Sequence, residues 1–269
     1  SSDGGATFSA TRRVDDGPGG TNASYPSIAV SPSGKVAVAW EDTRAGNKDV
    51  RCAISPDGVS FGVSVRMNTD NSGREQLRPR IAPGSGEAFH AVWYDNRSGD
   101  FDIYYARSSG SGFLPERRVD DTGNAGTFQA LPAVAVGPDE RVHVVWHQLG
   151  FDGYRIMYSG SADGIVFSQN IPVSPVSGIG KDQFQPRLRV GPGGTVHVVW
   201  HDRQNGYPDI FYANSTSAGK TFGQYVLVDD APSDTLSYSP VLGVDSLGEV
   251  HVAWWDNRTR QGSFGTNFQ

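Results

Sequence analysis

The stretch Pro26–Trp40, PSIAVSPSGKVAVAW, decides the fold because it recurs five times along the chain. Its closing tryptophan has counterparts at intervals of 53 or 54 residues, and a proline stands fourteen residues before each of them. A fixed interval of this length is typical of proteins built from stacked repeats, in which each unit buries its apolar face against its neighbours. The tryptophans are Trp40, Trp93, Trp146, Trp200 and Trp254, and the prolines are Pro26, Pro79, Pro132, Pro186 and Pro240.

Within each repeat the apolar residues alternate with polar ones, which is the period of a β-strand and not of a helix. In the first repeat the segments 26–30, 35–40, 49–55 and 63–67 have this pattern. Residues that favour turns and loops separate them. Four short strands in about 50 residues are typical of one blade of a β-propeller. The sequence therefore predicts an all-β, five-bladed β-propeller made of four-stranded antiparallel blades.

The two ends of the chain resemble the two parts of one blade. The last repeat stops near its third strand, and residues 9–16 resemble a fourth strand. Joining these parts would close the ring without leaving an unpaired edge, so we expect the N-terminal strand to complete the last blade. The alternative is an open fragment of a larger propeller. We expect one domain over residues 1–269, with units at about 24–70, 77–122, 130–175, 184–229 and 238–269 plus 1–16.

The composition argues against several classes of protein. The formal net charge of the 269 residues is −6, which disfavours nucleic acid as a partner. No apolar run is long enough to span a bilayer, so no membrane insertion is expected. The single cysteine, Cys52, excludes an intramolecular disulfide and a thiolate metal cluster. Only four lysines, against many Ser, Thr, Asn and Gly, favour an extracellular or periplasmic protein.

A short motif between the third and fourth strands resembles a known repeat. Residues 1–8, SSDGGATF, match the Asp-box pattern Ser-x-Asp-x-Gly-x-Thr followed by Trp or Phe, and shortened forms stand at 55–61 and 161–167. The chain therefore resembles the Asp-box, or bacterial neuraminidase repeat, propellers, which include sialidases, other glycoside hydrolases, sorting receptors and lectins. The resemblance implies that the box aspartates hold their own turns and do no chemistry. These aspartates are Asp3, Asp57 and Asp163.

Two further positions repeat in most units, and we expect them to build the blade. A catalytic group is needed once per site, so a residue found in nearly every unit is more simply explained as scaffold. An aspartate stands two residues after the tryptophan in four units, and an arginine stands four residues after it in three. Such a pair can hold the hairpin at its base. The aspartates are Asp42, Asp95, Asp202 and Asp256, and the arginines are Arg44, Arg97 and Arg258.

Histidines recur three residues before the tryptophan in four units, at His90, His143, His197 and His251. Equivalent positions in different blades cannot meet at one metal ion, so we expect buried histidines bonded to a neighbouring strand. The sequence therefore predicts no metal site and no cofactor. Calcium bound by the acid-rich loops before the prolines stays an alternative, although their spacing fits no known calcium loop.

Positions that vary among the repeats are the better candidates for ligand binding. The loops after the tryptophan and those before the proline open on one face, where propellers commonly bind ligands at the mouth of the channel. Aromatic faces stack on sugar rings, and arginine forks bind carboxylates. The alternative is that these side chains fill a narrow channel and face water. The candidates are Glu41, Tyr94, His147, His201, Trp255, Arg78, Arg80, Arg187, Arg189 and Phe151.

These features favour a non-catalytic module that binds carbohydrate or another extracellular polymer. The resemblance to sialidases implies an alternative, a glycoside hydrolase with an arginine triad, a Tyr–Glu nucleophile pair and an Asp acid. Sialidases have six blades, however, and their Arg-Ile-Pro signature is absent, the nearest segment being Arg80-Ile81-Ala82-Pro83. A structural or assembly role is the third alternative. The sequence leaves the ligand and the oligomeric state open.

Overall fold

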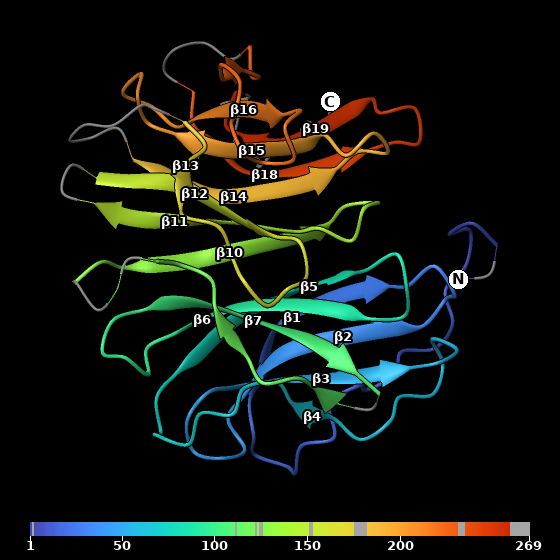
Figure 1. Ribbon diagram of the computed structural model, residues 1–269. Helices are drawn as coiled ribbons and strands as arrows, with labels where there is room; N and C mark the ends of the chain where they lie inside the picture. Colours follow the sequence, from blue (N-terminus) through green and yellow to red (C-terminus); the bar gives the residue numbers. More distant parts are fainter. Residues whose placement is uncertain are drawn as a thin grey trace.

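The computed structural model describes residues 1, 3–110, 112–121, 123, 126–150, 153–174, 182–230 and 235–258. This part of the chain consists of strands, turns and loops, and no helix within it is long and apolar enough to cross a membrane. The strands form antiparallel sheets that follow one another in chain order, from β1–β4 in blue to β18–β19 in red (Figure 1). The predicted all-β architecture of repeated antiparallel sheets is confirmed.

Units 1 to 4 each contain three long strands, followed by one short strand or, in unit 2, by two. Unit 1 contains β1 (Ala23–Val30), β2 (Val36–Asp42), β3 (Asp49–Ser55) and β4 (Val65–Arg66). Unit 2 contains β5 (Gln76–Pro83), β6 (Phe89–Asp95), β7 (Asp102–Ser109), β8 (Gly112–Phe113) and β9 (Arg117–Arg118). Unit 3 contains β10 (Gln129–Val136), β11 (Val142–Gly150), β12 (Gly153–Ser161) and β13 (Ile171–Pro172). Unit 4 contains β14 (Gln183–Val190), β15 (Val196–Asp202), β16 (Asp209–Ser215) and β17 (Val226–Leu227), and the described part of unit 5 contains β18 (Ser237–Val244) and β19 (Val250–Asp256).

The hydrophobic core lies between the units and not inside any one of them. The face of unit 2 that meets unit 1 carries Ile81, Phe89 and Trp93, which pack in one cluster with Ala39 and Cys52 of unit 1. Matching clusters join unit 2 to unit 3 and unit 3 to unit 4. Each sheet therefore needs its neighbours to bury its apolar face, which is why the interval of the repeat carries so much information about the fold.

The repeated tryptophan, aspartate and arginine form one hydrogen-bonded group at the end of the second strand. In unit 2, Trp93 Nε1 donates to Asp95 Oδ2 at 3.3 Å, and Arg97 donates to the same carboxylate through Nε at 3.0 Å and through its backbone N–H at 2.9 Å. The aspartate thus joins the strand, the turn and the arginine. The counterparts of this group are Trp40–Asp42–Arg44, Trp200–Asp202 and Asp256–Arg258.

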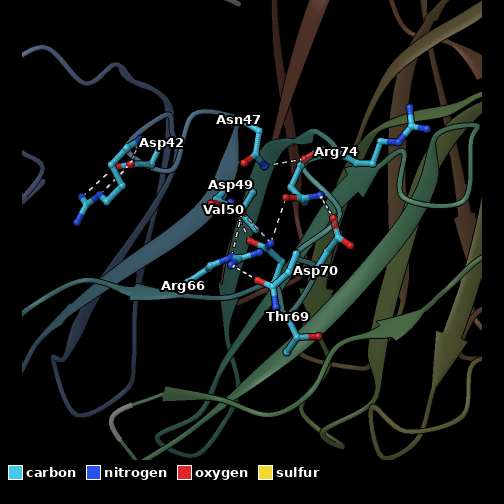
Figure 2. A network of polar contacts seen from close by, with 12 residues as sticks. Asp42, Asn47, Asp49, Val50, Arg66, Thr69, Asp70 and Arg74 are labelled. Carbon is cyan, nitrogen blue, oxygen red and sulfur yellow. Dashed lines mark hydrogen bonds and ion pairs between the residues drawn. The ribbon is translucent and has the colours of Figure 1, made fainter.

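A polar network joins the third strand to the fourth in unit 1 (Figure 2). Asp49 Oδ1 lies 3.0 Å from Arg66 Nε and accepts a hydrogen bond from Asn68 Nδ2 at 2.9 Å. Asn68 Oδ1 in turn accepts the backbone N–H of Val50 at 3.2 Å. In two later units an aspartate of the acid-rich loop accepts the equivalent N–H, and these pairs are Asp120–Ile103 and Asp229–Ile210.

Three of the four repeated histidines are bonded to the third strand of their own unit, as expected. Nδ1 of each lies 2.7 Å from a tyrosine hydroxyl, in the pairs His90–Tyr105, His143–Tyr158 and His197–Tyr212. Burial lowers the pKa of His90 and of His143 to about 4, so both are neutral at physiological pH. His251 differs, because it is exposed and its Nε2 lies 4.0 Å from Asp245 Oδ2.

The two end units are less buried than the inner ones. Ile28, on the outer face of unit 1, is 66% exposed, whereas its counterpart Ile81 in unit 2 is 7% exposed. On the outer face of unit 5, Val241 is 53% and Trp255 is 41% exposed. First strands contact one another in the order β1, β5, β10, β14 and β18, but the described residues of β18 do not pack along β1. The described residues form an arc, and closure of the ring stays a prediction.

Residues 9–16 lie against the open face of unit 1. Four of them, Ser9, Ala10, Arg12 and Val14, line a groove of about 460 Å³ together with Ile28, Val38 and Phe61. Asp16 Oδ2 accepts the backbone N–H of Ser64 at 2.8 Å, and Asp16 Oδ1 lies 2.8 Å from an Arg44 guanidinium nitrogen.

The contacts of Asp16 recur between later units. Asp121 accepts the backbone N–H of Asn170 at 3.0 Å, which matches the bond from Ser64 to Asp16. Asp230 pairs with Arg258 at 2.6 Å, which matches the pair of Asp16 with Arg44. The N-terminal segment therefore makes the contacts that a fourth strand makes with the unit that follows it.

Replacing Asp95 with alanine tests the scaffold role of the repeated aspartate. We expect Asp95→Ala to lower the free energy of unfolding by about 3 kcal/mol, because Trp93 Nε1 loses its acceptor and the half-buried Arg97 keeps only its pair with Glu116. Urea unfolding measures the change. The matched control is Gln148→Ala in unit 3, where Trp146 Nε1 has no hydrogen-bond partner among the described residues. That control should cost less than about 1 kcal/mol, and equal losses at the two positions would contradict the assignment.

Candidate functional site

A β-bulge interrupts the first strand of every unit just before the proline. The register between first and second strands shifts there in all five sheets. The residue before the proline has a φ between 47° and 52°, a region that residues other than glycine seldom adopt. Because the same positive φ recurs in each unit, we attribute it to the fold and not to the local sequence of one unit. The bulge residues are Tyr25, Arg78, Leu131, Gln185 and Ser239.

These five residues form a rim where the innermost strands meet, and we call this set the rim. Two neighbouring pairs touch across the boundaries between units, whereas Leu131 packs against the core cluster between units 2 and 3. Arg78 Nη2 lies 3.3 Å from the Tyr25 hydroxyl, and its guanidinium lies 4.2 Å above the Tyr25 ring. Ser239 Oγ donates to Gln185 Oε1 at 2.8 Å. Tyr25 is exposed and the other four are half-buried, so the rim presents different side chains to solvent at equivalent places.

The residues directly after the tryptophans are mostly buried behind this rim. Glu41, Tyr94, His147 and His201 are at most 8% exposed and lie between units. Only Trp255 is exposed, because the outer face of unit 5 is open. Phe151 lies outside the described residues. The structure thus places four of these five candidates behind the rim.

Glu41 illustrates the structural role of a residue directly after the tryptophan. Its Oε1 accepts the backbone N–H of Arg78 at 2.7 Å, and its Oε2 lies 3.2 Å from both Ser24 Oγ and Lys48 Nζ. The carboxylate therefore holds the strained bulge of the next unit in place. Tyr94 is also close to Arg78, and burial raises the pKa of its hydroxyl.

Two half-buried arginines, Arg80 and Arg187, directly follow the proline of the first strand in units 2 and 4. Burial, together with the charges of Arg80 and Arg189, lowers the pKa of Arg187 to about 10. Arg187 Nη1 donates to the carbonyl of its neighbour Pro186 at 3.0 Å. Arg189 is exposed near the end of β14, and it lines a cavity of about 380 Å³ with alanines and other apolar residues of the first strands.

Two buried histidines flank the arginines. The rings of His147 and His201 lie on either side of Phe184, each with its centroid 5.6 Å from the phenyl ring. Nδ1 of each has no hydrogen-bond partner among the described residues. Burial lowers the pKa of both to about 4, helped by Arg78 near His147 and by Arg187 near His201.

The structure therefore brings together Arg78, Arg80, Arg187, His147 and His201 from the sequence candidates, and it leaves Trp255 apart. Of the rim, only Arg78 is among the ligand-binding candidates given above, and Tyr25, Leu131, Gln185 and Ser239 are not. One signal was available, because the residue before a proline that recurs in every unit changes from unit to unit. The positive φ that aims this residue at the rim cannot be deduced from composition, since none of the five is glycine.

One group of possible metal ligands occurs in the described part of the chain. Ligand atoms of Asp245, Glu249 and His251 lie within 4.8 Å of one another in the turn between β18 and β19. Asp245 Oδ1 already accepts the backbone N–H groups of Leu247 and Glu249, so the turn itself accounts for its position. The group is far along the strand from the rim, at the opposite end of β18.

The positive φ at Leu131 predicts that glycine is a more stable replacement than alanine at this position, which is the reverse of the usual order in a strand. We expect Leu131→Gly to be more stable than Leu131→Ala by about 1 kcal/mol, because only glycine adopts positive φ without a steric cost. Thermal or urea unfolding of both variants measures the difference.

The matched control is Leu77, an extended residue one position before the bulge in unit 2. There alanine should be the more stable replacement by about 0.5–1 kcal/mol. The same order at both positions would show that the bulge at Leu131 is unstrained.

Comparison with known proteins yields a fold and no family. No protein-family model and no curated protein matches the chain. A protein of unknown function from Dyadobacter fermentans has a TM-score of 0.65 at 13% identity, over 90% of this chain and 77% of its own. An α-L-arabinofuranosidase of Fusarium graminearum, solved with arabinobiose, has a TM-score of 0.63 at 11% identity, over 94% of this chain and 82% of its own.

A Hadza microbial sialidase has a TM-score of 0.59 at 11% identity, over 89% of this chain and 54% of its own. At such identities the likeness concerns the fold alone. The arabinofuranosidase and the sialidase are β-propellers, and this chain shares their sialidase-like propeller fold.

Proposed function

We propose that the protein is an extracellular, non-catalytic propeller module that binds carbohydrate at the rim. One observation carries the proposal, the bulge repeated before each proline. The fold imposes the bulge in every unit, and what differs from unit to unit is the side chain that the bulge carries. A ring of differing side chains on a rigid frame is a common arrangement for binding.

The chemistry of the rim suits a sugar. Tyr25 is 46% exposed, and the Arg78 guanidinium lies over its ring, 4.2 Å from the centroid. An exposed aromatic ring stacks on the apolar face of a pyranose or furanose. The amide of Gln185 and the hydroxyl of Ser239 both donate and accept hydrogen bonds, as sugar hydroxyls require.

The similar structures support the same class of ligand. The arabinofuranosidase was solved with arabinobiose, and a second similar structure, the α-L-arabinanase of Penicillium chrysogenum, is a complex with the same disaccharide. The ligands of those proteins suggest arabino-oligosaccharides as the first probes. They do not identify the ligand of this chain, because the identities are 11% and 12%.

A sialidase-like glycoside hydrolase is the second candidate function. It is favoured by the likeness to a sialidase and by the gathering of Arg78, Arg80 and Arg187. Glycoside hydrolysis usually needs two carboxyl groups on either side of the scissile bond. Among the described residues, the carboxylate that bonds to a rim residue is that of Glu41, and it is engaged with Lys48 and the Arg78 backbone. This engagement favours binding over catalysis.

A carbohydrate array followed by calorimetry tests the proposal. We expect arabino-oligosaccharides or other glycans to bind, and Tyr25→Ala and Gln185→Ala each to weaken binding about tenfold or more, because stacking and hydrogen bonds are lost. Phe8→Ala is the matched control, since Phe8 is an exposed aromatic residue in the N-terminal turn, away from the rim.

Three outcomes decide between the candidates. Binding lost in the rim variants and kept in Phe8→Ala supports the module. Hydrolysis of an aryl arabinoside or sialoside, abolished by Arg78→Ala, would replace it with the hydrolase. Absence of any carbohydrate ligand would overturn both.

We also propose that the turns are Asp boxes and that residues 9–16 close a five-bladed ring as the last fourth strand. Asp3 accepts the backbone N–H of Thr7 at 3.0 Å, and Asp57 and Asp163 each accept two backbone N–H groups of their own turns. The contacts of Asp16 with Ser64 and Arg44 support the place of the N-terminal segment. Closure would bury the outer faces of units 1 and 5.

Thiol labelling tests closure. We expect Ile28→Cys and Val241→Cys to react slowly if the ring is closed, because both side chains would lie between blades. Phe8→Cys is the exposed control, and the native Cys52 gives little background, because burial raises the pKa of its thiol to about 12. Labelling of positions 28 and 241 as fast as that of position 8 would show an open arc.

A further inference from the structure

The cavity of about 380 Å³ lies where the first strands end, on the side opposite the rim. Its walls are residues of β1, β5, β10 and β14, which belong to units 1 to 4. They follow the rim residue of their strand by three to five positions, which places them roughly 10–16 Å farther along the strand. Sites for small molecules have volumes of roughly 300–1,000 Å³. The cavity is therefore separate from the rim and large enough for a small ligand.

The walls of this cavity are apolar except at one point. Ala29, Ala82 and Ala135 stand three residues after the repeated proline in units 1, 2 and 3, and Arg189 stands at the same place in unit 4. Valine, isoleucine and proline make up the rest of the lining. Among the described residues that line the cavity, Arg189 thus has the only polar side chain.

The guanidinium group of Arg189 has donors that the protein does not use. Its Nη1 donates to the backbone carbonyl of Leu188 at 2.9 Å. A guanidinium group carries five N–H donors. Within the described part of the chain, no carboxylate forms an ion pair with Arg189. Because Arg189 is exposed, a solute can reach the remaining donors.

The acidic residues in the hairpin turns of the two neighbouring units are bonded within their own turns. In unit 3, Asp139 Oδ1 accepts a backbone N–H of its turn at 3.2 Å. In unit 5, Asp245 Oδ1 accepts two such groups, at 2.9 and 2.8 Å. The positive charge of Arg189 is therefore available to an anion from solution.

The chemistry of the walls indicates what such an anion would carry. Water is a poor occupant of the apolar part of the cavity, because the walls offer it few hydrogen bonds. A ligand with an apolar body would displace this water and bury its own apolar surface. A carboxylate at one end of the ligand would accept paired, charge-assisted hydrogen bonds from the guanidinium fork. Both features occur together in a small aliphatic carboxylic acid.

We propose that this cavity binds a small aliphatic carboxylic acid, with the carboxylate on Arg189 and the hydrocarbon chain among the alanines and valines of the first strands. The inference goes beyond the carbohydrate function and does not depend on it, because no rim residue lines the cavity. A sugar does not suit this place, since its hydroxyl groups would lack partners along the apolar walls.

The test is calorimetric titration of the whole chain with sodium octanoate at pH 7. We expect a dissociation constant below about 1 mM. Acetate lacks the hydrocarbon chain and 1-octanol lacks the charge, so each should bind at least about tenfold more weakly than octanoate. Acetate or 1-octanol bound as tightly as octanoate would contradict the inference, because one of the two features would then have no role.

Two variants locate the bound acid. Arg189→Met removes the charge at an exposed position and keeps a long side chain, and it should weaken octanoate binding about tenfold or more. Val136→Phe places a larger side chain in the cavity and should also weaken binding about tenfold or more. If Val136→Phe fails to fold, Arg189→Met still decides. Arg107→Met, which changes an exposed arginine on β7, is the matched control and should bind as the native chain does.

A rim variant separates this inference from the proposed carbohydrate function. Octanoate binding that is kept in Tyr25→Ala and lost in Arg189→Met supports the cavity, whether or not a glycan binds at the rim. No octanoate binding, binding unchanged in Arg189→Met, or binding lost in Tyr25→Ala would each overturn the inference. Glycan binding is measured separately on the same variants, and it should be kept in Arg189→Met, so the failure of one proposal leaves the other standing.

Discussion

In each unit the first strand carries a proline whose nitrogen has no hydrogen to donate, so the pairing with the second strand breaks at that point. The chain accommodates the break by a bulge, and the residue before the proline takes a positive φ. Everything described at the channel depends on this constraint. It directs five side chains to the rim, and the carboxylate of Glu41 ties one of the strained amides to the neighbouring unit.

The architecture could be predicted from the sequence because it follows from periods that the chain repeats. The strands are visible as an alternation of apolar and polar residues, and the units as a fixed interval between tryptophans. Scaffold residues such as Asp95 and Arg97 are visible as residue types that recur in most units. The site was harder, because a bulge shifts the register and so changes which way a side chain points. Tyr94 and His147 therefore lie between units although their variability indicated a ligand, whereas Tyr25 and Leu131 lie on the rim unpredicted. Burial at the outer faces of units 1 and 5 depends on contacts with other parts of the chain. The residue pattern within one repeat carries no information about those contacts.

Two layers of different chemistry lie one below the other along the first strands. The rim offers an aromatic ring, an amide and hydroxyls, which suit uncharged groups of a sugar. The layer below carries the half-buried Arg80 and Arg187, and burial lowers the pKa of both guanidinium groups. A propeller can carry both because each unit contributes one side chain per layer, so changing one residue alters the ligand without altering the packing between blades.

A crystal structure of the protein with a bound oligosaccharide tests the central claim most directly, namely that the bulge residues form the binding surface. We expect a sugar ring stacked on Tyr25 with a hydroxyl within hydrogen-bonding distance of Gln185, and the bulges unchanged in φ. The chain also has a groove of about 500 Å³ on its outside, lined by Arg12, Val14 and Phe61 among others. A sugar found in that outer groove, with the rim empty, would contradict the claim.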